Sequence, residues 1–201
     1  MIPAPAPLWL RIAFTAFVIL LVPYYWTHYG WHNFLWLSDV ALFLTAVALW
    51  RTSRLIISMM AIGVLPLEIF WNVDFFTRLL TGVEVGGIAH YMFDETLPLL
   101  LRGFSLFHVA LPIIWITLLR RWGYDPHAFK AQTLVLWVTL IATYWFTRPD
   151  ENINWVFAPS RMGWQWMPEL AWLAAYMALV PALVHWPLHA LYRRLIETKS
   201  S

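Results

Sequence analysis

Long apolar stretches alternate along the chain with short segments that carry most of its charged residues. Each stretch reaches the roughly 17–25 residues that an α-helix needs to cross the hydrocarbon core of a bilayer. The pattern therefore predicts an all-α fold, a polytopic integral membrane bundle of six transmembrane helices that forms one domain over residues 1–201. The predicted spans are residues 8–26, 34–50, 55–75, 97–119, 131–147 and 168–190.

Prolines and glycines mark where these helices should bend or end. Prolines inside the spans predict kinks, which a bundle tolerates because neighbouring groups satisfy the freed carbonyls. Between the third and fourth spans, residues 83–90 contain Gly86 and Gly87, which predict a loop or a short re-entrant segment. The prolines within the spans are Pro23, Pro66, Pro112, Pro181 and Pro187.

The basic residues gather at one set of span ends. Nine of the 13 Lys and Arg residues lie there, and nine of the 11 acidic residues lie toward the opposite ends. Cytoplasmic loops of membrane proteins retain Lys and Arg, so both termini are predicted to be cytoplasmic. The basic residues are scattered over separate loops rather than forming a stripe, which argues against nucleic-acid binding. The nine are Arg11, Arg51, Arg54, Arg120, Arg121, Lys130, Arg193, Arg194 and Lys199.

The composition points to the lipid bilayer as the surrounding partner. Hydrophobic residues make up 61% of the chain and charged residues 12%, about half the charged share of an average soluble domain. Many of the 15 tryptophans lie at the ends of the spans, where indole rings settle among lipid headgroups. Because the chain has no cysteine, disulfides, thiolate nucleophiles and Cys-ligated zinc are excluded.

Three ionisable residues converge on one layer of the predicted bundle. At the helical rise of about 1.5 Å per residue, Asp39, Glu68 and Arg102 each lie roughly 8–10 Å below the outer surface. Charges inside a membrane are costly, so they usually face the bundle interior and pair with one another. We therefore expect Arg102 to lie within salt-bridge or single-water distance of Asp39 or Glu68, either in a polar pocket open to the outer side or in a clasp that holds three helices together.

Other polar residues extend this site in both directions. Asn72 lies one turn from Glu68 and is expected at the mouth of the pocket, with His28, His32 and Asp94. Ser105 and His108 continue the stripe that Arg102 begins on the fourth span. His108 would lie near the centre of the bilayer, where a histidine relays protons, ligates a metal or pigment, or makes an interhelical hydrogen bond.

Two histidine pairs are weak candidates for metal ligation. His28 and His32, and likewise His185 and His189, are spaced by four residues, which places both rings on one face of a helix. Gly30 divides the first pair and Pro187 distorts the second. The sequence therefore predicts no metal site and names no cofactor.

The loop after the fifth span contains Asn152-Ile-Asn154-Trp155. Asn side chains make local hydrogen bonds in turns, and Trp155 suits an interface anchor. The alternative is that this segment folds as a cap over the pocket.

Two resemblances bear on identity. The segments Phe93-Asp94-Glu-Thr-Leu-Pro98-Leu-Leu-Leu-Arg102-Gly-Phe-Ser105-Leu-Phe-His108, Trp122-Gly-Tyr-Asp125 and Asn152-Ile-Asn-Trp155-Val resemble a group of uncharacterised bacterial inner-membrane proteins. This likeness implies a location in the bacterial cytoplasmic membrane and no particular activity.

The second resemblance is to the ceramidase-like membrane hydrolases, which bind zinc through a Ser/His pair, an Asp and a His-x-x-x-His motif. Ser105/His108 and His185/His189 are similar to parts of that pattern. The chain departs from it in the Ser–His spacing of three rather than four, in a fifth span without a carboxylate, and in six predicted spans rather than seven.

Three functions remain open on these grounds. The favoured one is binding or transport of a small polar ligand or lipid headgroup in an outward-facing pocket. The second is a membrane-embedded enzyme that acts on a lipid or lipid-linked substrate, either with or without a catalytic metal ion. The third is a structural or cofactor-ligating subunit of a larger membrane complex or a homo-oligomer.

Overall fold

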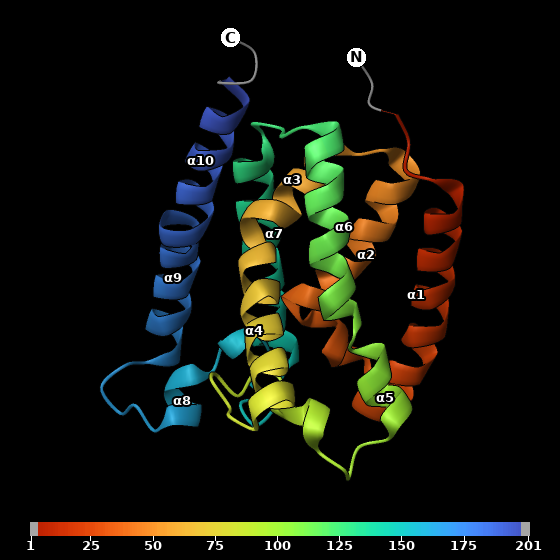
Figure 1. The fold of residues 1–201 in the computed structure, drawn as a ribbon. Helices are drawn as coiled ribbons and strands as arrows, with labels where there is room; N and C mark the ends of the chain where they lie inside the picture. The colour runs from red at the N-terminus through yellow and green to blue at the C-terminus, as the bar shows by residue number, and fades with distance from the viewer. Residues whose placement is uncertain (1–3, 198–201) are drawn as a thin grey trace.

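The computed structural model describes residues 4–197, and that part of the chain folds as an all-α bundle without β-strands (Figure 1). The all-α part of the predicted fold class is thus confirmed. The helices are α1 (Leu8–Tyr29), α2 (Leu37–Arg51), α3 (Arg54–Gly63), α4 (Leu65–Thr81), α5 (Leu99–Phe104), α6 (Phe107–Trp122), α7 (Ala128–Phe146), α8 (Ala158–Met162), α9 (Glu169–Val180) and α10 (Trp186–Glu197). Short 3₁₀ segments are η1 (Trp31–Leu35), η2 (His90–Phe93) and η3 (Ile153–Trp155), and η4 (Pro181–His185) is a π-helical turn.

Within residues 4–197, three helical rods are long and apolar enough to cross a membrane: Leu8–Tyr29, Leu99–Trp122 and Glu169–Leu195. A fourth results if α3 and α4 together form one broken span, bent by 53°. The predicted span 34–50 corresponds to α2, which has only 15 residues. The predicted span 131–147 corresponds to the 19-residue α7, whose first turns hold Lys130 and Gln132 and lower its hydropathy.

The bend between α3 and α4 follows from local sequence. Pro66 stands in the first turn of α4, where its missing N–H costs no helical hydrogen bond, although its ring obstructs a continuous helix from α3. One residue before the break, Gly63 lets α3 approach α7 closely. A Cβ atom on Gly63 would lie 2.2 Å from Nε2 of Gln132.

The two ends of the bundle differ. Figure 1 shows that α1 begins and α10 finishes at the same end, which we call the termini end; the α2–α3 turn and the α6–α7 connection also lie there. The opposite, distal end holds η1, α5, α8 and the chain between α4 and α5. The basic residues that predicted the topology belong to segments of the termini end, except Lys199, which lies outside the described residues.

The centre of the bundle is closely packed. Trp115 of α6 is completely buried, and its indole Nε1–H donates a 2.8 Å hydrogen bond to Oγ1 of Thr45 on α2. Thr45 in turn donates to the carbonyl of Ala41 at 2.7 Å. Large apolar side chains such as Leu80 and Trp145 are exposed on the circumference, as expected of helices that face lipid.

Candidate functional site

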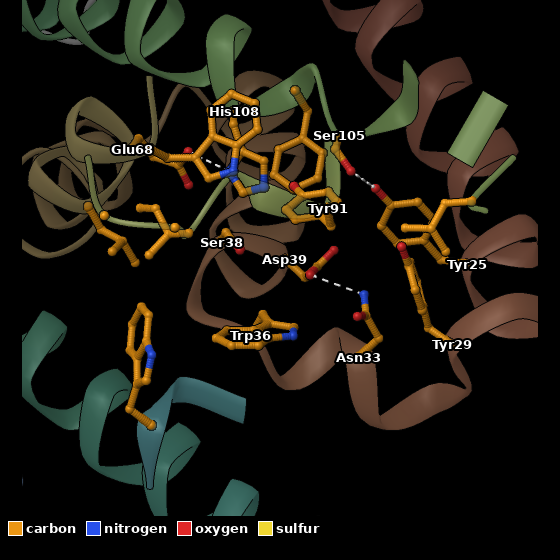
Figure 2. Close-up of a pocket in the computed structure, with 18 residues that line it drawn as sticks. Tyr25, Tyr29, Asn33, Trp36, Ser38, Asp39, Glu68, Tyr91, Ser105 and His108 are labelled. Carbon is orange, nitrogen blue, oxygen red and sulfur yellow. Dashed lines mark hydrogen bonds and ion pairs between the residues drawn. The ribbon is translucent and has the colours of Figure 1, made fainter. Parts of the chain in front are cut away.

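A cavity of about 500 Å³ lies toward the distal end of the bundle (Figure 2). Its walls come from the end of α1, from η1 and the start of α2, from α4, from the loop that follows α4, and from the junction of α5 and α6. Its lining residues are Tyr25, Tyr29, Asn33, Trp36, Ser38, Asp39, Leu67, Glu68, Trp71, Gly86, Gly87, Ile88, Tyr91, Leu97, Ser105, Phe107, His108 and Trp155.

Asp39 brings a carboxylate into this cavity from the first turn of α2. Its side chain is only 3% exposed. Oδ2 accepts a long hydrogen bond of 3.4 Å from Nδ2 of Asn33, whereas Oδ1 has no hydrogen-bond partner in the described structure. A buried carboxylate oxygen without a donor is costly, so the site holds acceptor capacity that the protein itself does not satisfy.

Glu68 and His108 form the second polar feature of the cavity. His108 Nδ1 lies 2.6 Å from Oε2 of Glu68, a contact that joins α4 to α6. The imidazole also stacks on Trp71, with ring centroids 4.6 Å apart, and on Phe107. Glu68 is 1% exposed, and its second oxygen, Oε1, has no partner among the described residues. The pair is therefore rigidly placed but not fully satisfied.

Aromatic side chains build much of the remaining wall. Figure 2 shows Tyr25, Tyr29, Trp36 and Tyr91 around the carboxylate of Asp39. The hydroxyl groups of Tyr25 and Ser105 share a hydrogen bond of 2.7 Å between α1 and the α5–α6 junction. The wall thus presents ring faces and edges close to an acidic group.

The loop after α7 reaches the cavity through Trp155 and is fixed to the start of α2 by Asn154. The buried Asn154 side chain accepts a hydrogen bond from Leu37 N–H at 2.9 Å and donates to the carbonyl of Leu35 at 2.7 Å and to Thr143 Oγ1 at 3.1 Å. It thereby caps the start of α2, which carries Asp39. Trp155 follows with φ of 57°, an uncommon backbone conformation for a bulky residue, and its side chain lines the cavity. This placement agrees with the alternative that the segment is a cap.

A second loop is fixed to α4 by Asp74. Its carboxylate accepts hydrogen bonds from the N–H groups of Val85 at 3.0 Å, Gly86 at 2.8 Å and Ala89 at 2.8 Å. Gly86 also packs closely, since a Cβ atom there would lie 2.4 Å from the Phe70 ring. Residues 83–90 therefore form an ordered loop whose Gly86 borders the cavity. Of the two alternatives that the sequence predicted, a loop or a short re-entrant segment, the structure has the loop.

Of the three charges predicted to meet, only the two carboxylates share the cavity. Arg102 does not line it and instead donates from Nη1 to the carbonyl of Met92 at 3.1 Å. Among the ion pairs of the described residues, none joins Arg102 to Asp39 or Glu68, so the expected pair does not form by direct contact, and its water-bridged form stays a prediction. The physical reason is the turn between α5 and α6, which interrupts the straight stripe assumed for Arg102, Ser105 and His108.

Asn72 and Asp94 have local roles outside the cavity lining. Nδ2 of Asn72 donates to the carbonyls of Glu68 and His108, both at 2.7 Å, and so ties α4 to α6 behind the Glu68–His108 pair. Asp94 accepts hydrogen bonds from the side chain and the backbone N–H of Thr96, which lower the pKa of its carboxyl group. Their predicted place at the mouth of a pocket is thus replaced by helix pairing and turn formation.

The two histidine pairs do not act as pairs. His28 bonds to the carbonyl of Tyr24 at 2.8 Å, and His32 faces Glu151 at 3.5 Å. At the other end, His189 Nδ1 shares a 2.7 Å hydrogen bond with the Tyr124 hydroxyl. No three His, Cys, Asp or Glu side chains in the described part of the chain gather as ligands for a metal ion.

The apolar pattern of the sequence did not indicate the aromatic wall. It assigns tryptophans at span ends, such as Trp155, to the membrane interface and gives no role to Tyr25 or Tyr29. An available signal is the clustering of Tyr25, Tyr29 and Trp36 around His28 and Asn33 in the sequence. Position along a span does not distinguish a ring that faces lipid from one that faces a cavity.

Comparison with models of known protein families, with curated proteins and with solved structures gave no match for this chain.

Proposed function

We propose that this chain is a multi-pass membrane protein with a ligand site in the cavity at its distal end. It binds or transports a small polar ligand or a lipid headgroup there. The observation that carries the proposal is the cavity of about 500 Å³ into which Asp39 and Glu68 bring buried, unpartnered carboxylate oxygens. Ligand pockets in proteins commonly combine apolar walls with a few convergent polar groups. Charged groups within membrane-embedded bundles also mark ligand or ion pathways more often than not.

The topology that suits this role has six spans, with both termini in the cytoplasm and the cavity open to the outer side of the bacterial inner membrane. The rods α1, α2, α3–α4, α5–α6, α7 and α9–α10 would be the spans. The shared end of α1 and α10, together with the basic residues there, supports this orientation. Reporter fusions should place residue 125 inside and residue 155 outside; the opposite result would reverse the proposed orientation.

Blocking the cavity tests the binding role directly. Ser38 lines the cavity and is buried, so Ser38→Phe should fill part of the space. The purified protein would be screened by thermal shift against a panel of polar small molecules and soluble lipid headgroups. We expect at least one compound to stabilise the parent and the exposed-site control Ser160→Phe, and to leave Ser38→Phe unchanged. Stabilisation of none, or of all three alike, would count against a ligand site in this cavity.

A second candidate function is a membrane-embedded enzyme that uses His108 as a general base. The observation in its favour is the 2.6 Å contact between His108 Nδ1 and Glu68, which fixes the ring orientation as carboxylates do for catalytic histidines. Ser105 does not complete a nucleophile pair with it, because its hydroxyl bonds to Tyr25.

Turnover distinguishes this candidate from simple binding. The protein would be incubated in nanodiscs of bacterial lipid extract, and lipid species would be followed by mass spectrometry. An enzyme would generate new lipid products with the parent and lose most of that turnover in His108→Gln. A binding protein would leave the lipid composition unchanged with both.

A further inference from the structure

We propose that the ligand of the distal cavity is a small organic monocation, with its ammonium group held between Asp39 and Glu68 and its alkyl groups against the aromatic wall. This inference rests on the proposed binding function and adds the chemical class of the ligand.

The charge of the lining favours a cation. Two carboxylates face the cavity, and no Lys or Arg is among the lining residues that the structure describes. Arg102, the nearest expected counter-charge, is engaged with the carbonyl of Met92. An anionic ligand would face two acidic groups without a compensating base, and a neutral polyol would leave them uncompensated.

The partners of the two carboxylates favour a single positive charge. Glu68 already has a partner in His108, whose Nδ1 lies 2.6 Å from its Oε2. Among the described residues, Asp39 accepts a hydrogen bond only from the amide of Asn33, at 3.4 Å. Asp39 is therefore the carboxylate without a close partner, and a ligand with one positive charge would supply that partner. The unpartnered oxygens, Oδ1 of Asp39 and Oε1 of Glu68, are the acceptors that an ammonium N–H or a polarised N-methyl group requires.

The size and the walls of the cavity favour an organic cation over a bare metal ion. A calcium ion takes six to eight oxygen ligands at about 2.3–2.6 Å, and the cavity offers two carboxylates within a far larger space. Cations also bind over the electron-rich faces of Trp and Tyr rings. Tyr25, Tyr29, Trp36 and Tyr91 surround the Asp39 carboxylate in Figure 2, and so combine both kinds of recognition at one place.

The test compares matched compounds of different charge. The protein would be placed in nanodiscs of phosphatidylglycerol, and binding of ethanolamine and choline would be measured by calorimetry beside glycerol and acetate. We expect both cations to bind and the neutral and anionic compounds to bind at least about tenfold more weakly. The ammonium group of ethanolamine donates charge-assisted hydrogen bonds, which are among the strongest in proteins, so Asp39→Asn and Glu68→Gln should each weaken ethanolamine binding about tenfold or more. Asp94→Asn, which removes a carboxylate outside the cavity, should bind ethanolamine as the parent does.

A second variant keeps the test decisive if Asp39→Asn fails to fold. Tyr29→Leu retains both carboxylates and removes one ring of the wall, and it should weaken choline binding several-fold. Unchanged choline binding in Tyr29→Leu, or unchanged ethanolamine binding in a folded Asp39→Asn, would overturn the proposal.

Two further results distinguish a failure of this proposal from a failure of the proposed binding function on which it rests. If glycerol or acetate binds better than choline, and Ser38→Phe abolishes that binding, the cavity is a ligand site but the ligand class is wrong. If none of the four compounds and none of the wider panel binds, and phosphatidylethanolamine in the disc has no effect on the melting temperature, both proposals fail.

The same chemistry is present in free amines and in lipid headgroups, and the lipid of the nanodisc distinguishes them. If the ammonium group belongs to a lipid, phosphatidylethanolamine in the disc should raise the melting temperature and suppress binding of added ethanolamine. If the ligand is a free amine, ethanolamine should bind equally in both discs. Either result supports the proposed class, whereas absence of ethanolamine binding in phosphatidylglycerol discs together with no effect of phosphatidylethanolamine would exclude it.

Discussion

The helices α2 and α6 carry polar residues at two successive levels, and the two levels are built differently. At the distal level, Asp39 and His108 border a cavity, and a carboxylate oxygen stays without a partner. Two turns further along, Thr45 and Trp115 bond to each other at 2.8 Å in a closed core. Along the same two helices, the polar side chains of one level hydrogen-bond to each other, whereas those of the distal level leave a carboxylate oxygen without a partner.

This difference shows which buried polar groups indicate a site. Burial alone does not, since Thr45 and Trp115 are as inaccessible as Glu68. The distal level is distinguished by three properties together: carboxylates, unpartnered oxygens and adjacent space. Such groups cost stability, and proteins retain them where binding or catalysis repays that cost.

The largest expected effect concerns the closed level. Trp115→Ala should lower the free energy of unfolding by about 3–5 kcal/mol, because it leaves a large void and removes the hydrogen bond to Thr45. Thermal unfolding in detergent would measure this. The matched control is Trp145→Ala, whose ring is 75% exposed and should cost less than about 0.5 kcal/mol. Equal melting temperatures for the two variants would contradict the contrast between levels.

A smaller effect is expected for the partner of Trp115. Thr45→Val keeps the side-chain shape and leaves the indole N–H without an acceptor, at a cost of about 1–3 kcal/mol. In a Trp115→Phe background the same substitution should cost less, since the donor is then absent. A double-mutant cycle measures this coupling, and strict additivity would show that the hydrogen bond contributes nothing.

At the distal level, we expect the substitution to change the stability in the opposite direction. Asp39→Asn neutralises a buried carboxyl group that, among the described residues, accepts a hydrogen bond from Asn33 alone, and should leave the stability unchanged or raise it by about 0.5–2 kcal/mol. The melting temperature of the ligand-free protein measures this. A decrease as large as that of Thr45→Val would show that Asp39 is structural, and that the cavity is a by-product of packing.

The smallest expected effect tests the termini end. Burial raises the pKa of the Asp125 carboxyl, but hydrogen bonds from His127 and the charge of Arg54, 3.7 Å away, outweigh burial and lower it overall. A group with a lowered pKa stabilises the folded state above its unfolded value of about 4, and that contribution is lost as the pH falls through the folded value.

We therefore expect the parent to lose up to about 1 kcal/mol more than Asp125→Asn between roughly pH 5 and pH 3. Parallel pH–stability curves for the two proteins would show that this contact contributes nothing measurable. His90→Gln serves as a control, because it alters an exposed carboxylate contact at the opposite end.

The helical architecture followed from the sequence because the spacing of apolar stretches reflects the length of helix needed to cross a membrane. The first span, predicted as 8–26, is α1, and the fourth is α5–α6. Pro66 also indicated where the helix breaks between α3 and α4. The bend of 53° between these two helices could not be predicted from the sequence, because it depends on how α4 packs against α6.

For the site, helical spacing in the sequence places Asp39, Glu68 and Arg102 at similar depth, with Ser105 and His108 about one and two turns deeper, because residue number sets depth along a helix. Which of these residues meet depends on the tertiary fold. The rotation of each helix and the turn between α5 and α6 gave Glu68 the partner His108 and directed Arg102 to Met92. The aromatic wall likewise comes from segments far apart in the chain, and no local pattern encodes the side on which a ring faces.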